Sequence, residues 1–460
     1  MKRRNFIQML AATGMTASLP LTANKAFAAA PDQFLIIVNA GGGWDPTSLC
    51  DPKGRLGQYL DERPTSGNDG SINSIDLNDA KLNATSGMRW SDIPRINGSD
   101  ATTARVTNQF DNFFETYHDQ LTVINGVDNG TNNHSSGNRA TWSGNLEMGY
   151  PSLAALFAAS SNPSLPMAYI SNGGYDFTAS LVSRARASSA SFIDKLADPI
   201  TVDPERDRGE FIYRSAKNSG QDIDIYKQVK LAQKKRLERQ KSQAELPLRR
   251  QQLNQLFTVR QEDNDLAKLS EAKALIEKDL ATNDHMNNRD QGFKRQASLV
   301  AAAFKSGVAA SANISTGGFD THGNHDNGQY QNLGDLLEGV AYLQEALTIA
   351  GIADKTTVVI GSDFGRTPYY NTGNGKDHWP VTSMMVMHPK GNGKGGKVFG
   401  SSTNKFRSQT LDRTTGQANA NGQLLTPAHI NLALRKELGI ADNTLAVRFP
   451  LNVDDFDIFS

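Results

Sequence analysis

Short, uninterrupted runs of apolar residues recur along the chain, and each ends in a polar or glycine-rich turn. The clearest covers residues 34–38, Phe-Leu-Ile-Ile-Val, and leads into Asn39, Ala40 and three glycines. A continuous apolar run of this length, bounded by turn residues, is typical of a strand buried on both faces of a parallel sheet. Five more runs are predicted to be buried strands: residues 121–125, 167–170, 308–314, 356–362 and 383–388.

Helical patterns lie between these runs. Residues 152–159 form one, and residues 333–350 form a longer one with a single apolar face at Leu336, Leu337, Val340, Leu343 and Leu347. Strands that alternate with helices predict an α/β fold whose sheet is covered on both sides. We therefore expect a doubly wound, mainly parallel sheet.

A stretch from about residue 222 to 290 has a different composition, rich in Lys, Arg, Gln and Glu with sparse Leu and Ile at helical spacing. We expect a helical insertion within about residues 205–295, divided by Pro247 into two antiparallel helices. Its charges are most simply a solvated face. Nucleic-acid or partner binding by residues 234–236 is the weaker interpretation, because Glu238 and Glu245 interleave with the basic residues.

The amino terminus has the layout of a twin-arginine signal peptide. Lys2, Arg3 and Arg4 precede an uncharged run over residues 9–24, and Ala26-Phe27-Ala28 offers a small-residue cleavage site. Residues 1–30 are therefore predicted to direct export by the twin-arginine translocase to the periplasm or beyond, with residues 31–460 as one domain. No later run approaches about 18 apolar residues, so we expect no membrane contact in the mature form.

Charge and cysteine content narrow the chemistry. The 48 basic residues balance the 48 acidic ones, so no overall field favours a nucleic-acid partner. The single cysteine excludes an internal disulfide and any thiolate-rich metal site. A bound metal must therefore use oxygen and imidazole ligands.

Such ligands gather in segments that follow predicted strands. Ligands bind at the carboxyl ends of strands in an open parallel sheet, so these segments are expected to converge. Asp45 follows the glycines after the first strand, although a carboxylate before Pro46 can also simply start a turn. The strongest cluster is Gly317-Gly318-Phe319-Asp320-Thr321-His322-Gly323-Asn324-His325, in which Asp320 and His322 are the better candidates. Carboxylate with imidazole favours zinc, manganese or iron over calcium.

Three further segments supply candidates. Residues 132–144 contain His134 and Ser135; a serine in such a segment can also be a simple capping residue. Asp363 ends the predicted strand 356–362 and is suited to metal coordination, and Arg366 could bind an anionic group in bidentate fashion. His378 could complete the ligand shell of an ion.

Several of these segments resemble known motifs. The segments that carry the likeness are Trp44-Asp45, Gly318-Phe319-Asp320-Thr321-His322, Ser362-Asp363-Phe364-Gly365-Arg366-Thr367 and Asp377-His378. Together they resemble the exported family called domain of unknown function 1501, over most of the mature chain. That family is similar to the alkaline phosphatase superfamily, which includes sulfatases. Ser135 and Trp142 also keep the spacing of the alkaline phosphatase nucleophile motif.

The resemblance implies roles for the candidates. Asp45, Ser135 and Asp363 would form the nucleophile-side metal site, and Asp320, His322 and His378 a second one. Arg366 or Arg139 would bind nonbridging oxygens, and His134 could act as a ligand or a general acid. Phe364 departs from the pattern, because two-metal members usually carry a histidine there. The departure favours a single-metal, sulfatase-like site or a site that has lost catalysis.

Two functions follow as expectations. The first is an exported hydrolase of phosphate or sulfate esters that uses one or two divalent ions, zinc or manganese with calcium as the alternative. Ser135 would attack a small anionic ester while metal and arginine neutralise the developing charge. The second is a noncatalytic periplasmic binding protein that keeps the same fold and holds a glycan or a partner protein.

Overall fold

The computed structural model describes most of the chain after residue 30. The described residues are 31–53, 80–186, 216–218, 221–223, 225–243, 269, 272–274, 276–278 and 291–460. The predicted signal peptide, Pro247 and much of the predicted insertion lie outside these residues.

Eight strands form the central sheet, in the order β14-β4-β13-β10-β1-β9-β5-β6. Their bounds are β1 Phe34–Ala40, β4 Leu121–Asp128, β5 Tyr169–Ser171, β6 Arg184–Ala185, β9 Ser311–Thr316, β10 Thr356–Ser362, β13 Val381–Met387 and β14 Lys397–Phe399. The central strand β1 runs parallel to β10 on one side and to β9 on the other. Only β13 is antiparallel to both of its neighbours, β10 and β4. The expected α/β fold with a mainly parallel sheet is confirmed.

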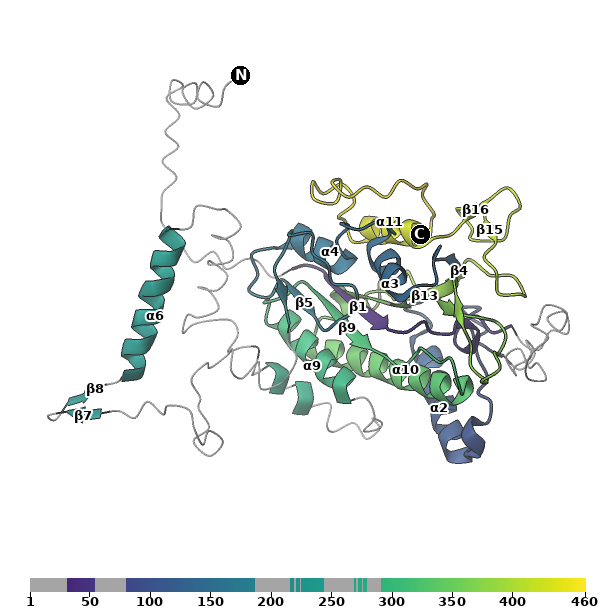
Figure 1. Cartoon of the computed structure of the whole chain (residues 1–460), viewed down its shortest axis with the longest axis horizontal. Coiled ribbons are helices and arrows are strands. Elements are labelled where there is room, and N and C mark those ends of the chain that lie inside the picture. Colours follow the sequence, from purple (N-terminus) through teal and green to yellow (C-terminus); the bar gives the residue numbers. More distant parts are fainter. Residues whose placement is uncertain are drawn as a thin grey trace, which may run out of the picture.

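Alternate residues of β1 belong to two separate cores, as the pleat of a strand requires. Ile36 and Val38 pack with helices α2 (Asp100–Tyr117), α9 (Gln291–Lys305) and α10 (His325–Ala350). Leu35 and Ile37 pack with residues of α3 (His134–Ser143), α4 (Leu153–Ser161) and α11 (Pro427–Glu437). Figure 1 shows these two groups of helices on opposite faces of the sheet. The three layers explain why β1 is buried along its whole length.

The remaining described elements are small, apart from one helix. Two-stranded sheets pair β2 (Lys81–Leu82) with β3 (Arg89–Trp90), β7 (Ala216–Asn218) with β8 (Gln221–Ile223), β11 (Gly365–Arg366) with β12 (His378–Trp379), and β15 (Thr410–Leu411) with β16 (Gln423–Leu424). Helix α6 covers Ile225–Ser242, within the predicted insertion. None of the helices in the described part of the chain combines the length and apolar character that crossing a bilayer requires.

Each of the six predicted strands is present, and several helices differ from expectation, among them α10 and α2. Helix α10 begins at His325, before the predicted start at residue 333, and extends to the expected end at Ala350. Helix α2 was not predicted, although Val106, Phe110 and Phe113 lie on its buried face. Because only a narrow face of this helix contacts the core, its apolar positions are few and do not stand out among the many polar residues.

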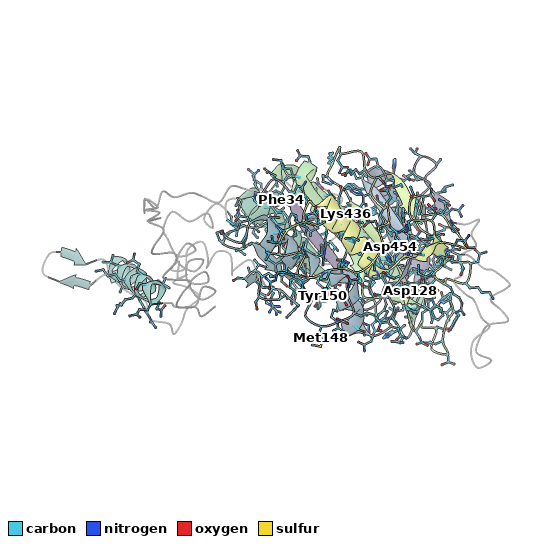
Figure 2. All side chains as sticks on the ribbon, turned by 90° about the horizontal axis from the view of Figure 1, so that it is seen from above. Phe34, Asp128, Met148, Tyr150, Lys436 and Asp454 are labelled. Atoms are coloured by element: carbon cyan, nitrogen blue, oxygen red, sulfur yellow. The ribbon has the colours of Figure 1, made fainter. Side chains whose placement is uncertain are left out.

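Strand direction brings the candidate residues to one edge of the sheet. Strands β1, β9 and β10 end in register, with Ala40 opposite both Ser362 and Thr316. The antiparallel β13 starts where β4 ends, with Val381 opposite Asp128. Figure 2 shows Phe34, at the amino end of β1, and Asp128, at the carboxyl end of β4, well apart across the body. Loops that follow β1, β4, β9 and β10, and the segment before β13, therefore meet at this carboxyl edge.

Candidate metal centre

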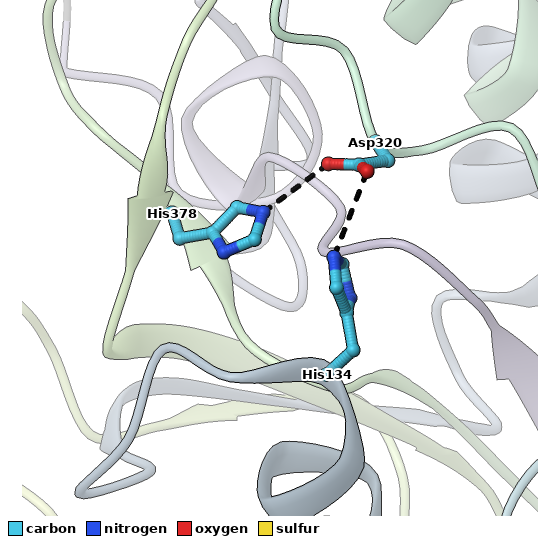
Figure 3. Close-up of side chains that lie close together, drawn as sticks. All are labelled: His134, Asp320 and His378. Carbon is cyan, nitrogen blue, oxygen red and sulfur yellow. Dashed lines mark hydrogen bonds and ion pairs between the residues drawn. The ribbon is translucent and has the colours of Figure 1, made fainter.

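Asp320 lies at the middle of a histidine cluster on the carboxyl edge. Its Oδ1 is 3.1 Å from His322 Nε2 and 3.2 Å from His378 Nε2, and its Oδ2 is 3.6 Å from His134 Nε2. Figure 3 shows His134 and His378 directed at the two oxygens of Asp320. Suitable ligand atoms of these three residues all lie within 4.8 Å of one another, close enough to hold one ion.

The other ring nitrogen of each histidine faces an acceptor. Nδ1 of His322 is 2.8 Å from Asp377 Oδ1, and Nδ1 of His378 is 2.8 Å from the carbonyl oxygen of Asn132. Nδ1 of His134 contacts Asp363 Oδ2. Because carboxylates and carbonyls only accept, each Nδ1 must carry the proton in the neutral ring. The three Nε2 lone pairs then point toward Asp320, an arrangement that a cation stabilises.

The Asp320 carboxylate stays ionised in this setting. Burial alone would raise its pKa, but the hydrogen bond from Arg366 and the nearby positive charge lower the pKa to about 2. Asp377 behaves similarly, since the hydrogen bond from His322 lowers its pKa despite partial burial. With Asp363, these are three carboxylates beside one guanidinium, that of Arg366. Neutral histidines leave two negative charges, which one divalent cation would balance.

Asp363 supports the cluster by holding His134. Its Oδ1 accepts hydrogen bonds from the backbone N–H groups of Gly42 and Gly43, at 3.1 and 2.6 Å. Its Oδ2 holds His134, and its side chain is only 1% exposed. Asp363 therefore orients one histidine and closes the turn after β1, a role that leaves both oxygens already engaged.

His134 reaches the cluster as the first residue of α3. Asn133 caps this helix, because its side chain accepts from the N–H groups of Ser135 and Ser136. The sequence pattern predicts no helix in residues 132–144, and the structure shows that most of this segment is helical. Helix geometry fixes the direction of His134, while the next residue, Ser135, is exposed to solvent.

Ser135 is not brought into the cluster by any hydrogen bond of its hydroxyl to the described residues. Its backbone N–H donates to Asn133 Oδ1, at 3.1 Å. Ser135 directly follows His134 in α3 and is exposed to solvent.

Arg366 is not positioned to bind a substrate anion. It is fully buried, and its guanidinium donates to the carbonyl oxygens of Gly42, Gly43 and Lys376 as well as to Asp320 Oδ1, at 2.6 Å. Arg139 instead donates to the carbonyl oxygen of Leu146, at 2.6 Å. Arg366 thus ties three loops of the centre together, and its contacts leave little of the guanidinium for an anion.

Asp45 lies in a second, fully buried cluster. Its Oδ2 is 2.6 Å from Lys376 Nζ and 3.0 Å from His325 Nε2. Burial opposes ionisation, but Lys376 and His325 lower the pKa of Asp45 far below its usual range. Burial also lowers the pKa of His325, helped by the Lys376 charge. Asp45 therefore has a built-in counterion and also caps a turn through the N–H of Thr47.

Phe364 packs against the histidine cluster. Its ring centroid lies 4.8 Å from that of His134 and 4.5 Å from that of His378. The side chain is fully buried. An aromatic ring thus fills the space beside two of the histidines, which favours one ion over two.

Comparison with known proteins now fixes the family. A model described as "Protein of unknown function (DUF1501)" matches residues 32–433. The chain belongs to this family. No curated protein matches the sequence significantly.

Two solved structures show distant similarity to this DUF1501 chain. One is a Bacteroides thetaiotaomicron protein described with the metabolism of multiple glycosaminoglycans: 10% identity, TM-score 0.32, covering 93% of this chain and 76% of that one. The other is Ps i-CgsB, crystallised with k-i-k-neocarrahexaose: 9% identity, TM-score 0.26, covering 93% of this chain and 75% of that one. Similarity this low carries no argument about function.

The sequence alone assigns no specific role to two residues that contact Asp45 in this region. Lys376 and His325 are fully buried partners of Asp45, and neither was proposed for a specific role. A lysine and a histidine in polar, glycine-rich segments look like exposed residues. Only the strand order, which places residue 376 beside residue 45, reveals their partner.

Proposed function

We propose that this DUF1501 protein is a hydrolase of phosphate or sulfate esters that uses one divalent metal ion, zinc or manganese. The ligands are His134, Asp320, His322 and His378. The observation that carries the proposal is the set of three histidines whose Nδ1 atoms are held by acceptors while their Nε2 atoms face one carboxylate. Such pairing of a ligand histidine with an outer acceptor is the usual support of a metal site.

The donor set fits such an ion. Three imidazoles and a carboxylate suit zinc or manganese, whereas calcium prefers oxygen alone. Without a cation, the Nε2 atoms of His322 and His378 lie 3.0 Å apart beside the Asp320 oxygen. Two lone pairs facing each other at that separation repel, so either a proton or a metal ion must lie between them. The two uncompensated negative charges favour the divalent ion.

The remaining residues prepare the centre for an ester. A bound ion would supply positive charge for the ester oxygens. Asp363 and Asp377 keep the protons on Nδ1 of His134 and His322, so that Nε2 stays available. The side chains of Asp320 and His322 are 49% and 48% exposed, so a small ester can reach them from solvent. Ser135, exposed beside His134, is the proposed nucleophile.

A second candidate function is noncatalytic binding of a glycan or partner protein at the same edge. The buried and fully engaged Arg366 favours it, because ester hydrolysis gains from a cation aimed at the transferred group. With either function, we propose that the protein is exported to the periplasm by the twin-arginine pathway, because residues 1–30 have the layout of such a signal peptide.

Metal content and turnover measured on the same samples test the proposal. We expect close to one zinc or manganese ion per chain by mass spectrometry, and loss of that ion in Asp320→Asn. Hydrolysis of 4-nitrophenyl phosphate or sulfate should depend on the ion and disappear in Ser135→Ala. Lys235→Ala, on the exposed part of α6, is the control and should retain both properties.

The outcomes separate the candidates. An ion without turnover of either ester supports noncatalytic binding. Turnover that survives in Ser135→Ala removes Ser135 as nucleophile and leaves the metal centre standing. Wild-type protein that contains no ion and gains none from added zinc or manganese overturns the metal centre itself.

A further inference from the structure

Lys376 connects the buried cluster around Asp45 to the proposed metal ligands. Its Nζ is 2.6 Å from Asp45 Oδ2 and 3.3 Å from Thr47 Oγ1, and the whole side chain is buried. Asp45 Oδ2 also lies 3.0 Å from His325 Nε2 and accepts a hydrogen bond from the Ser48 hydroxyl, at 2.9 Å. A buried charge needs a partner of opposite sign, so the ammonium and the carboxylate hold each other in place.

The backbone of Lys376 is part of the centre. Its N–H donates to the carbonyl oxygen of Thr321, at 3.1 Å, and its carbonyl oxygen accepts from Arg366 Nη1, at 3.0 Å. The next two residues are Asp377, which holds His322, and His378, a proposed ligand. The residue before it, Gly375, approaches the His322 backbone so closely that a Cβ would lie 1.9 Å from its carbonyl carbon. Small movements of residue 376 are therefore transmitted to both histidines.

We propose that Lys376 is a positioning residue of the metal centre, whose buried ion pair with Asp45 fixes the segment that carries Asp377 and His378. The inference rests on the proposed metal site. Lys376 binds no metal and touches no ester. Its side chain anchors the segment to the loop after β1. Asp45, assigned to metal binding by resemblance, serves as the anchor point.

The chain offers a matched control. Lys53 is also buried, and its Nζ is 2.6 Å from Asp51 Oδ1 and 3.3 Å from the carbonyl oxygen of Ser402. None of these residues carries or adjoins a proposed ligand. Lys53→Met thus removes a buried lysine from a similar ion pair elsewhere in the fold.

The experiment compares zinc affinity in wild type, Lys376→Met, Asp45→Asn/Lys376→Met and Lys53→Met by competition with a chromophoric chelator. Thermal unfolding reports the stability of each metal-free variant. Substitution of a residue that orients a metal ligand typically weakens metal affinity by about 10- to 100-fold. We expect Lys376→Met and the double variant to bind zinc at least about tenfold more weakly than wild type. Lys53→Met should keep wild-type affinity even if it unfolds at a lower temperature.

The double variant protects the test against misfolding, because it leaves no unpaired charge when Lys376→Met alone fails to fold. Wild-type affinity in the double variant would overturn the inference, since the ion pair would then be dispensable for positioning. Equal weakening in Lys53→Met would also overturn it, because general loss of stability would explain the effect. If wild type binds manganese but not zinc, the same comparison is made with manganese. Wild type that binds neither ion is a different result, which refutes the proposed function instead.

Discussion

Asp377→Asn tests whether an outer carboxylate supports the proposed centre. Asp377 Oδ1 is 2.8 Å from His322 Nδ1, so it fixes the proton there and makes Nε2 a better donor to a metal. Asparagine keeps an accepting oxygen but removes the charge. Because the Asp377 side chain is 53% exposed, water screens the charge and the effect should lie near the lower end of the usual range. We expect zinc affinity to fall about tenfold, or about 1.4 kcal/mol.

Asp377→Leu removes the acceptor as well as the charge and should weaken binding further, toward about 100-fold. The assay is chelator competition at pH 7. The folded-state pKa of Asp377 is lowered, so its charge is fully present above the ordinary value and is lost only as pH falls through the lowered one. The difference between wild type and Asp377→Asn should therefore be constant from about pH 6 to 8. Asp354→Asn, an exposed change in the short 3-10 helix η4 (Ala353–Lys355) just before β10, is the control. The reasoning is refuted if Asp377→Asn binds zinc as tightly as wild type.

Three further predictions concern stability and metal loading. Gly43→Ala should lower the free energy of unfolding by about 2–5 kcal/mol, because Gly43 has φ +78° and a Cβ would lie 2.5 Å from the Phe364 ring. Denaturant titration measures this loss. The control is Gly351→Ala, at φ +71° in open space, which should lower the free energy of unfolding by only about 1–2 kcal/mol. Burial, with the charges of Lys397 and Lys394, lowers the pKa of His388 to about 4, so the unfolded chain takes up a proton that the folded one resists. Stability should thus fall by up to about 3 kcal/mol between about pH 6.5 and 4, and His388→Gln should flatten this part of the profile; an unchanged profile would contradict the assignment. Zinc binding should weaken as pH falls, because a metal ligated by imidazole competes with protons, and a pH-independent affinity would argue against histidine ligands.

The fold was largely predictable because its strands are buried on both faces. A strand such as residues 34–38 has no polar alternation, and such a run is typical of a strand in a sheet that is covered on both faces. The reversed direction of β13 could not be predicted, since a buried strand looks the same in either direction. Helix α2 was missed because its core contact uses only a few residues, such as Val106 and Phe110, among many polar ones.

The candidate site was predictable as a group of segments, and the partners within it were not. Asp320, His322, His378 and His134 come together because each adjoins a strand end at the carboxyl edge. Sequence spacing does not show which side chains are buried. The sequence therefore offers Asp45 as a metal candidate beside Asp320, and does not show that a lysine 331 residues away is its partner.

The position of β1 has a consequence for how the chain reaches its native state. This strand is made early, yet its partners β9 and β10 lie near residues 311–316 and 356–362. Pairing over such a sequence separation is slow, because a long loop must close before the strands gain from their contact. Until then, an uncharged apolar segment of seven residues stays without its two neighbours. Refolding should therefore be slow and prone to aggregation, and a chaperone that shields residues 34–40 should raise its yield.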